Sequence, residues 1–283
     1  GAGKVDDVSV GATREEDASD SSSKAVPVAQ GSKWLVAKLT RREMVAHDVG
    51  IFSLSLSRPL LLPTGKHILV KGHVGGRSTS RPYTPIDAPN QELHTVRVLL
   101  RRYELGKMSR LLHDLPLGGE VFVRGPIGRY SHKEMVRPRM VFIFAGTGVT
   151  PIYQVLQHMC ADEKGKEIEM VNDAETKGKE PTIALLGQHR ELRDELLGSE
   201  LLNMVESNPD LISHYSVFLS RTPAELSSQA GDHYRPGYMG KIDIDRAVAH
   251  HARDAVRFLI CGPSGFAKSV VGMVEELGFT RAD

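Results

Sequence analysis

Arg81-Pro82-Tyr83-Thr84-Pro85 is the stretch around which the rest of the chain is organised. It places a cation, an aromatic ring and a hydroxyl next to one another, and its two prolines fix φ and stiffen the segment. The arginine offers a fork of donors that suits a pair of phosphate oxygens, the tyrosine offers a flat face, and the threonine offers one short hydrogen bond. Together these features predict a dinucleotide site, and a flavin fits them best. The competing interpretation is an ordinary proline-rich turn with an exposed arginine.

Short strands surround this stretch. Apolar runs lie on both sides of it, at residues 68–70 and 96–100, so Arg81 to Pro85 is expected at the end of a strand that opens into a turn. Ile51 to Leu56 alternates with period two, as a half-buried strand should. Five or six short strands and one helix-like stretch predict a small antiparallel β-barrel. The expected strands are Trp34–Leu39, Ile51–Leu56, His67–Lys71, Val96–Tyr103 and Glu120–Arg124.

A helix is expected from Gly106 to Leu115, because its leucines fall on one face. Unpaired backbone N–H groups and the positive dipole end make a helix start able to hold an anion. The residues at this start are Gly106, Lys107, Met108 and Ser109, and the lysine adds charge. A simple capped surface helix is the competing interpretation, but together with Arg81 a shared pyrophosphate is the better account.

The periodicity changes after Pro138. Met140 to Phe144 is a continuous apolar run, as in a parallel strand buried on both faces. Strands and helices then alternate toward the end of the chain, with a helix expected at Asp194–Val205 and a polar, irregular loop at residues 222–238. This alternation predicts a doubly wound parallel sheet. Ligands bind such sheets beyond the carboxyl ends of the strands. Three loops are expected there: Gly146-Thr147-Gly148 with Thr150 and Pro151, Ser220-Arg221, and Cys261-Gly262-Pro263.

Length and composition narrow the class of function. The 283 residues are enough for two domains, and a formal net charge of +1 gives no reason to expect a nucleic-acid partner. The two cysteines, Cys160 and Cys261, exclude a disulfide framework and a plant-type iron–sulfur cluster, and they suggest a reducing compartment. No cluster has metal-ligand spacing, so no metal site is predicted. No run approaches the ~20 apolar residues of a membrane span, and no signal peptide is visible.

Residues 1 to about 31 are small, polar and charged, which predicts a flexible linker. Such a linker suggests a tethered domain, although a disordered terminus without a role accounts for it equally well. A membrane anchor or another domain upstream of residue 1 is therefore left open. The predicted organisation is a linker at 1–31, a β-barrel domain at 32–137 and an α/β nucleotide-binding domain at 138–283.

Five motifs occur in the order and spacing of one family. They are Arg81-Pro-Tyr-Thr84, Gly106-Lys-Met-Ser109, Arg124-Gly-Pro-Ile-Gly128, Gly146-Thr-Gly-Val-Thr-Pro151 and Cys261-Gly-Pro263. From about residue 33 to residue 283 the chain therefore resembles the cytochrome b5 reductase branch of the ferredoxin–NADP reductase family. It is most similar to the reductase module of the NAD(P)H cytochrome b5 oxidoreductases. The resemblance implies an antiparallel β-barrel FAD domain, followed by an α/β doubly wound parallel-sheet domain that binds NADPH or NADH.

The resemblance also assigns roles to single residues. Arg81 would pair with the FAD pyrophosphate, Tyr83 beside Pro82 would stack on the isoalloxazine, and Thr84 would hydrogen-bond near its N5. Cys261 would lie near the carbon that transfers the hydride, so Thr84 and Cys261 are the expected catalytic residues. Other residues expected to contact FAD are Val98, Leu100, Arg101, Tyr103, Gly106, Lys107, Met108, Ser109 and Thr150. Those expected to hold the nicotinamide nucleotide are Gly146, Thr147, Gly148, Pro151, Gly262 and Pro263.

The function implied by the resemblance is hydride transfer from NAD(P)H to FAD, followed by single-electron transfer to a haem protein such as cytochrome b5. No His-Pro-Gly-Gly haem motif occurs in this chain, so the haem domain is expected on another protein or elsewhere on the same full-length chain. The implied location is intracellular, in the cytoplasm or on the cytoplasmic face of the endoplasmic reticulum. The alternative is a flavin-binding interaction module without turnover, against which the intact motifs argue.

Ser220 and Arg221 bear on the choice of nucleotide. NAD-selective relatives carry an acidic residue at this place, where a carboxylate accepts from the ribose 2′-OH and repels a 2′-phosphate. Serine can donate to that phosphate and arginine can pair with it, so NADPH is expected to be accepted at least as well as NADH. Arg190 would either add a second charge or be a solvated arginine beside Glu191.

Five basic residues lie in the part of the sequence expected to bind FAD. Some of them are expected to bind FAD, and the rest are either solvated or steer an acidic partner such as cytochrome b5. The five residues are Arg97, Arg101, Arg102, Lys107 and Arg110.

Overall fold

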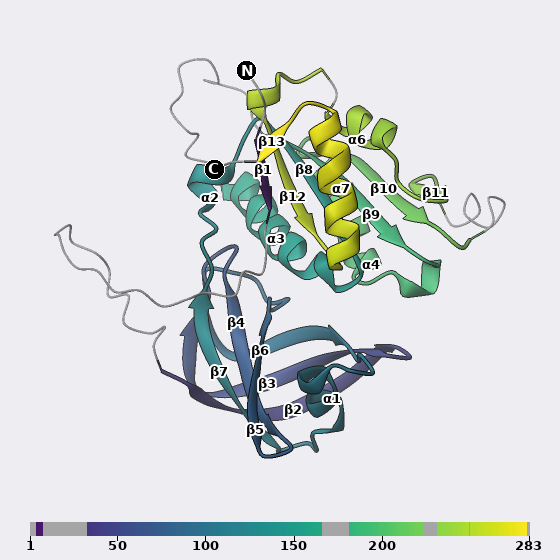
Figure 1. The fold of residues 1–283 in the computed structure, drawn as a ribbon. Coiled ribbons are helices and arrows are strands. Elements are labelled where there is room, and N and C mark those ends of the chain that lie inside the picture. Colours follow the sequence, from purple (N-terminus) through teal and green to yellow (C-terminus); the bar gives the residue numbers. More distant parts are fainter. Residues whose placement is uncertain (1–3, 8–32, 166–180, 223–230, 249, 282–283) are drawn as a thin grey trace. The chain divides into compact units, whose positions relative to one another are not determined.

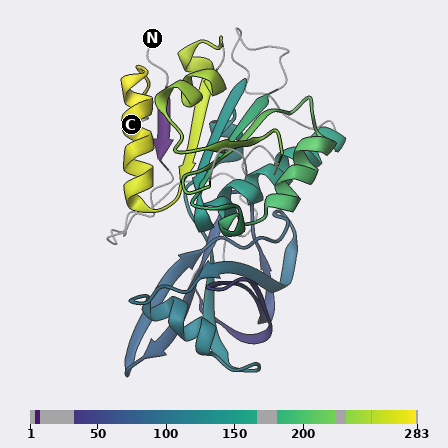
Figure 2. The same cartoon turned by 90° about the vertical axis from the view of Figure 1, so that its right-hand side faces the viewer.

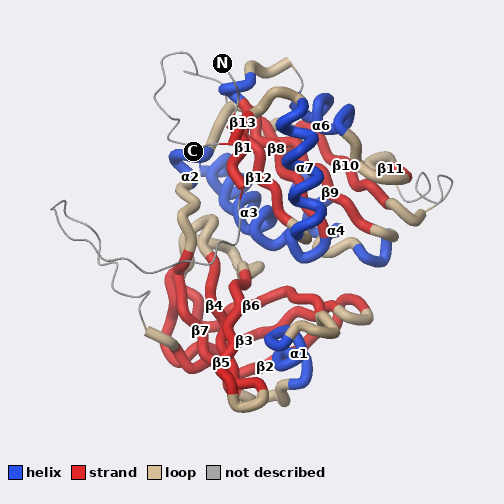
Figure 3. The backbone as a smooth tube through the Cα atoms, viewed as in Figure 1, coloured by secondary structure: helices blue, strands red, loops and turns tan. Residues whose placement is uncertain are grey.

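The computed structural model describes residues 4–7, 33–165, 181–222, 231–248 and 250–281. The chain divides into two compact units, whose main boundary lies between Arg129 and Tyr130. In Figure 3 one unit consists mostly of strands, whereas strands and helices alternate in the other. The change of periodicity in the sequence therefore corresponds to a change of architecture.

The first unit is a six-stranded antiparallel barrel with the strand order β5-β4-β7-β2-β3-β6 (Figure 1). An isolated antiparallel bridge between Pro85 and Val98 links the segment after β5 to β6 and so joins the two ends of that order. The predicted barrel is confirmed. Its elements are β2 (Leu35–Ala46), β3 (Val49–Leu61), β4 (His67–Val74), β5 (Arg77–Tyr83), β6 (Glu92–Arg101), α1 (Lys107–Asp114) and β7 (Glu120–Ile127).

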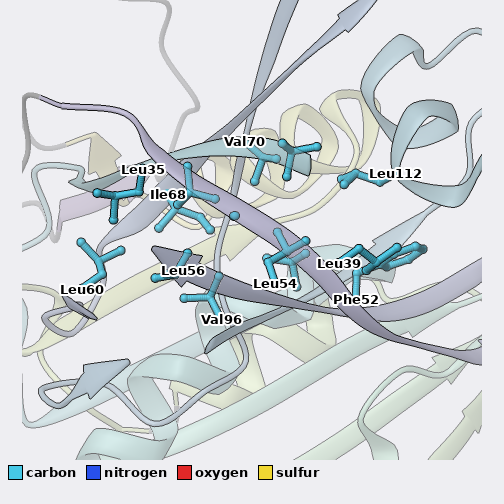
Figure 4. Packing of buried hydrophobic residues seen from close by; sticks show 14 of the residues in the cluster. Leu35, Leu39, Phe52, Leu54, Leu56, Leu60, Ile68, Val70, Val96 and Leu112 are labelled. Atoms are coloured by element: carbon cyan, nitrogen blue, oxygen red, sulfur yellow. The ribbon is translucent and has the colours of Figure 1, made fainter. Parts of the chain in front are cut away.

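Alternation along the strands fills the interior of this barrel. On β3, Phe52 and Leu54 are fully buried, whereas the intervening Ser53 is half-buried. Figure 4 shows these side chains packed with residues of β2, β4, β6 and α1, namely Leu35, Leu39, Ile68, Val70, Val96 and Leu112. On the buried face of β4, Gly72 lies where α1 approaches, since a Cβ there would lie 2.8 Å from a methyl group of Leu111. Helix α1 therefore packs directly on β4.

The second unit contains a seven-stranded parallel sheet with the order β11-β10-β9-β8-β12-β1-β13. The predicted doubly wound parallel sheet is confirmed. Within the stretch predicted as a linker, the structure describes only residues 4–7, and these form β1. The strands are β1 (Lys4–Asp7), β8 (Arg139–Ala145), β9 (Thr182–His189), β10 (Ile212–Leu219), β11 (Tyr234–Pro236), β12 (Val256–Cys261) and β13 (Thr280–Arg281).

Helices lie on both faces of this sheet, as the turned view in Figure 2 shows. On one face Val141 and Ile143 of β8 pack in a cluster with residues of α6 and α7. The alternating residues Met140, Phe142 and Phe144 are also buried, which requires cover on the opposite face. Helix α3 contacts β8 and β12, and α4 contacts β10. The helices are α2 (His132–Met135), α3 (Val149–Gly165), α4 (Gly198–Ser207), α6 (Lys241–Val248) and α7 (Ser264–Glu276).

Two elements differ from the sequence prediction. Helix α4 begins at Gly198 rather than at Asp194, because Leu197 takes a left-handed conformation with φ at 59° and a short 3₁₀ turn precedes it. Strand β11 forms inside the loop expected to be irregular, where Tyr234 to Pro236 pair in parallel with β10. In the part of the chain that the structure describes, no helix combines the length and apolarity needed to cross a membrane.

Leu54→Ala is expected to lower the free energy of unfolding by about 2–5 kcal/mol, because a fully buried leucine loses its transfer energy and leaves a cavity. Denaturation followed by the fluorescence of Trp34, the one tryptophan of the chain, measures this loss. Leu61→Ala on the same strand is the control, since that side chain is 41% exposed and should cost less than about 1 kcal/mol. Equal losses for the two variants would contradict the packing described.

Candidate functional site

Arg81 lies near the end of β5, opposite Val70 of β4. It is exposed, and its guanidinium donates to the carbonyl of its own neighbour Ser80 at 2.8 Å. Among the described residues no carboxylate pairs with Arg81. An exposed guanidinium without a carboxylate partner is available to an anion, which the predicted contact with a pyrophosphate would need.

Tyr83 and Thr84 follow at the point where β5 ends. The Tyr83 ring packs against the barrel core, and burial raises the pKa of its phenol well above the usual range, so the hydroxyl stays protonated. Thr84 is half-buried and directly precedes the bridge between Pro85 and Val98. The same backbone bridge that joins the barrel ends therefore fixes this threonine.

Asp87 reinforces that bridge and was not singled out in the sequence. Its carboxylate is buried and accepts from the Arg97 backbone N–H at 2.6 Å and from Arg97 Nε at 2.7 Å. The N–H of Ile86 donates to the Arg97 carbonyl at 2.9 Å. The segment that carries Thr84 is therefore attached to β6 by three hydrogen bonds. An acidic residue two positions after the Thr84-Pro85 pair was the available signal in the sequence.

The residues in and after β6 that were expected to line the flavin differ in exposure. Val98 and Leu100 are buried in the barrel core, so they would meet a flavin only through their backbone. Arg101 forms an ion pair with Asp48 at 3.3 Å, so its charge is already paired within the barrel. Tyr103, which follows β6, is 53% exposed and presents a free ring surface.

The start of α1 is built by Gly106 and Ser109. The Ser109 hydroxyl donates to the Gly106 carbonyl at 3.0 Å and accepts from the Tyr103 N–H at 3.2 Å. A Cβ at Gly106 would lie 2.3 Å from the Ser109 oxygen, so this close turn requires glycine. Met108 is buried and anchors the helix, whereas Lys107 is exposed. The first helical N–H groups therefore remain open to an anion.

The switch in strand order lies between β8 and β12, which are neighbours in the sheet. Each is followed by a glycine turn and a helix, α3 after β8 and α7 after β12. A Cβ at Gly148 would lie 2.3 Å from the Cys261 carbonyl oxygen, so the two turns touch through their backbones. Gly146 has φ at 54° with open space where a side chain would project. Backbone at this crevice can therefore approach a ligand closely.

The other predicted residues of these turns have different places. The Thr150 hydroxyl is buried and donates to the Thr147 carbonyl at 3.1 Å, which stabilises the turn. Pro151 lies in the first turn of α3. Cys261 is half-buried and lies outside any disulfide, and Pro263 is an exposed residue at the start of α7.

The ends of β9 and β10 carry the predicted ribose residues. The Ser220 N–H donates to the His189 carbonyl at 3.0 Å, and the Arg221 N–H donates to the Arg190 carbonyl at 2.8 Å. Both arginine side chains are exposed. The structure therefore places Arg190 next to Arg221, as the hypothesis of a second charge requires.

Tyr238 is a candidate binding residue that the sequence analysis missed. Its ring is 78% exposed, although its neighbours are held: Gly237 donates to the Leu219 carbonyl at 2.9 Å and Met239 donates to Gln188 Oε1 at 2.8 Å. These bonds place an exposed ring beside the ends of β9 and β10. An aromatic residue between Gly237 and Gly240, in a loop otherwise polar, was the available signal.

Neither Cys160 nor Cys261 lies in a disulfide bond in this structure. Within the described ranges, no group of three or more His, Cys, Asp or Glu side chains could hold a metal ion. The polar groups that the predicted site residues offer in each unit are hydrogen-bond donors, including backbone amides. Such groups fit phosphates and the polar edges of flat rings.

Arg81→Ala is expected to purify as a folded protein largely without FAD, because the guanidinium is an exposed cation near the end of β5 and its hydrogen bond goes to the carbonyl of its own neighbour Ser80. The ratio of flavin to protein absorbance measures the loss. Arg77→Ala, an exposed arginine at the start of the same strand, is the matched control. Full flavin occupancy in the Arg81 variant would show that the pyrophosphate is held elsewhere.

Gly148→Ala is expected to raise the KM for the nicotinamide nucleotide at least about tenfold, since its Cβ would displace the Cys261 backbone and a misplaced site loses orientation. FAD content should stay largely unchanged, because Arg81 and the start of α1, which would hold the FAD pyrophosphate, belong to the barrel. Gly265→Ala is the control, as a Cβ there meets nothing within 4 Å. An unchanged KM in the Gly148 variant would argue against a ligand at this crevice.

Comparison with known proteins identifies both units. Residues 36–132 match the family model described as an oxidoreductase FAD-binding domain, and residues 142–272 match that of an oxidoreductase NAD-binding domain. NADH-cytochrome b5 reductase 1 of Candida glabrata is 28% identical over 87% of this chain and 80% of its own length. The NADPH nitrate reductase of Emericella nidulans is 31% identical over 98% of this chain, which corresponds to 32% of that longer protein.

Solved structures agree with these matches. The cytochrome b5 reductase domain of Ulva prolifera nitrate reductase superimposes with a TM-score of 0.71 at 26% identity, covering 90% of this chain and 97% of that domain. The CS-b5R domains of human Ncb5or share the fold at a TM-score of 0.69. The protein is an enzyme that uses FAD and a nicotinamide nucleotide, and it belongs to the cytochrome b5 reductase branch of the ferredoxin–NADP reductase family.

Proposed function

We propose that this oxidoreductase accepts NADPH at least as well as NADH and passes single electrons to a haem protein of the cytochrome b5 type. The observation that carries the nucleotide choice is the hydrogen bond from the Arg221 N–H to the Arg190 carbonyl, which joins the backbones of two exposed arginines beyond the ends of β9 and β10. The acceptor is supported by the relatives, whose names are cytochrome b5 reductase and nitrate reductase.

FAD supplies the chemistry that links a hydride donor to one-electron acceptors. The protein itself has to bind the flavin and the nucleotide and orient them. Arg81 and the start of α1 would hold the pyrophosphate, and Tyr83 would lie against the ring system. Thr84 would hydrogen-bond near N5, in the position that the bridge from Pro85 to Val98 fixes. Cys261 and the Gly146–Gly148 turn would hold the nicotinamide. No side chain is needed as a general acid or base.

The surroundings of Arg190 favour a phosphate. Its sequence neighbour Glu191 pairs with Arg193 at 2.8 Å, so that carboxylate is committed to another cation. Ser220 adds a hydroxyl at the end of β10, where a carboxylate would select for the 2′-OH of NADH. Two arginines and a hydroxyl favour the 2′-phosphate of NADPH.

The acceptor would meet a smaller basic surface than the sequence suggested. Of the five cations, Arg97 pairs with Asp87, Arg101 with Asp48 and Arg102 with Asp114. Lys107 and Arg110, both exposed on α1, have no carboxylate partner in the part of the chain that the structure describes. Steering of an acidic partner would therefore depend on α1.

Ser220→Asp should move the ratio of kcat/KM for NADPH over NADH toward NADH by roughly 1 to 3 kcal/mol, because a charge-assisted contact is lost and a repulsion is added. Steady-state kinetics with both nucleotides measure the shift. Ser207→Asp is the control, because it makes the same charge change at the exposed end of α4. Ser207 lies five residues before the start of β10, whereas Ser220 follows the end of that strand, so the ratio should stay unchanged. A strongly NADH-selective wild type that Ser220→Asp does not alter would refute the proposal.

Steering by α1 predicts that the second-order rate of cytochrome b5 reduction falls as ionic strength rises, since exposed charges are screened by salt. Arg110→Gln should lower the rate at low salt and flatten this dependence. Arg129→Gln, which removes an arginine remote from α1 in sequence, serves as the comparison. A rate that does not respond to ionic strength would exclude electrostatic steering.

A further inference from the structure

A carboxylate in the nucleotide-binding unit holds two tyrosines, and none of the family motifs includes it. Glu195 accepts from the Tyr215 hydroxyl at 3.1 Å through one oxygen and from the Tyr234 hydroxyl at 2.6 Å through the other. The ring of His233 lies between the two phenols, stacked on Tyr215 at 4.9 Å and tilted against Tyr234 at 4.1 Å. We call Glu195, Tyr215, His233 and Tyr234 the tyrosine clamp.

The local backbone is shaped to make this clamp. Leu197 has a positive φ of 59°, which turns the chain sharply before α4. A Cβ at Gly198 would lie 2.5 Å from the Glu195 carboxyl carbon, so glycine leaves the room that this carboxylate occupies beside the first turn of α4. Burial, together with the Glu195 carboxylate, raises the pKa of both phenols, so they remain protonated donors.

The clamp joins the two segments that carry the ribose arginines. Glu195 follows Arg190 by five residues, in the connection between β9 and α4. Tyr215 lies in β10, which ends just before Arg221, and Tyr234 opens β11 and leads to the exposed Tyr238. Beyond the strand ends the segments meet through the Arg190 carbonyl and the Arg221 N–H, and Glu195 ties the β9–α4 connection to Tyr215 and Tyr234 through side-chain hydrogen bonds.

We propose that Glu195 is a positioning residue for nucleotide selection: by holding Tyr215 and Tyr234 it sets the spacing of Arg190, Arg221 and Tyr238 around the ribose of the bound nucleotide. This inference rests on the proposed use of NADPH. It assigns the choice of nucleotide to a residue that does not touch the nucleotide.

The sign of the effect separates this role from simple electrostatics. If Glu195 acted only as a charge near a phosphate site, its removal would strengthen NADPH binding, because a negative charge repels a 2′-phosphate. If it acts by position, its removal weakens NADPH binding although the site becomes more positive. Tyr234→Phe breaks one bond of the clamp without changing any charge, and Gly198→Ala displaces the carboxylate without removing it.

The experiment measures kcat and KM for NADPH and NADH on holoenzyme carrying Glu195→Ala, Tyr234→Phe, Glu200→Ala or Arg221→Gln. Glu195→Ala is expected to raise the KM for NADPH about tenfold, the scale of a lost hydrogen bond to a charged group, with a smaller change for NADH and an unchanged kcat. Tyr234→Phe should change it in the same direction. Glu200→Ala, an exposed carboxylate of α4, is the charge-matched control and should leave the KM for NADPH unchanged or lower.

The outcomes are distinguishable. An unchanged or lowered KM for NADPH in Glu195→Ala and Tyr234→Phe, with a raised KM in Arg221→Gln, overturns the clamp and leaves the proposed function standing. An unchanged KM in Arg221→Gln overturns both. Equal losses for NADPH and NADH, with reduced kcat and lower thermal stability, would show that Glu195 serves the fold alone and would also overturn the inference.

Discussion

The nucleotide-binding unit depends on one close approach, in which the turn after β8 touches the backbone after β12 with no room for a side chain at Gly148. The two strands are neighbours, yet the helices that follow them, α3 and α7, pack on opposite faces of the sheet. This divergence opens the crevice in which such sheets bind ligands. Cys261, at the carboxyl end of β12, and Ser220, at that of β10, lie along the same edge of the sheet because all its strands are parallel.

In the barrel an equivalent constraint links fold and site. The bridge between Pro85 and Val98 joins the two ends of the strand order, and the hydrogen bonds of Ile86 and Asp87 to Arg97 reinforce it. The residue fixed by this closure is Thr84, which would contact the flavin. The site therefore consists of backbone that the barrel must order in any case, while the exposed Arg81 and the start of α1 add the charge and the N–H groups that a pyrophosphate needs.

The motifs predicted the architecture because each contains residues with a single conformational use, such as the positive φ of Gly146 and the tight turn at Gly106. Contacts between segments distant in sequence were not predictable in the same way. The sequence around Glu195 does not indicate its hydrogen bonds to Tyr215 and Tyr234. The candidate role of Tyr238 depends on the hydrogen bonds of Gly237 and Met239 to neighbouring strands, which are also not local in sequence. Side-chain direction was also hidden: Val98 and Leu100, expected to line the flavin, point into the core.

This oxidoreductase should move electrons from a nicotinamide nucleotide through FAD, rather than merely bind both. The most direct test is an anaerobic titration of the purified yellow protein with NADPH, and separately with NADH, followed by visible absorbance. We expect the flavin absorbance to be lost near one equivalent of NADPH and to return when ferric cytochrome b5 is added. A protein that keeps its flavin absorbance with both nucleotides would contradict electron transfer and would favour a binding module without turnover.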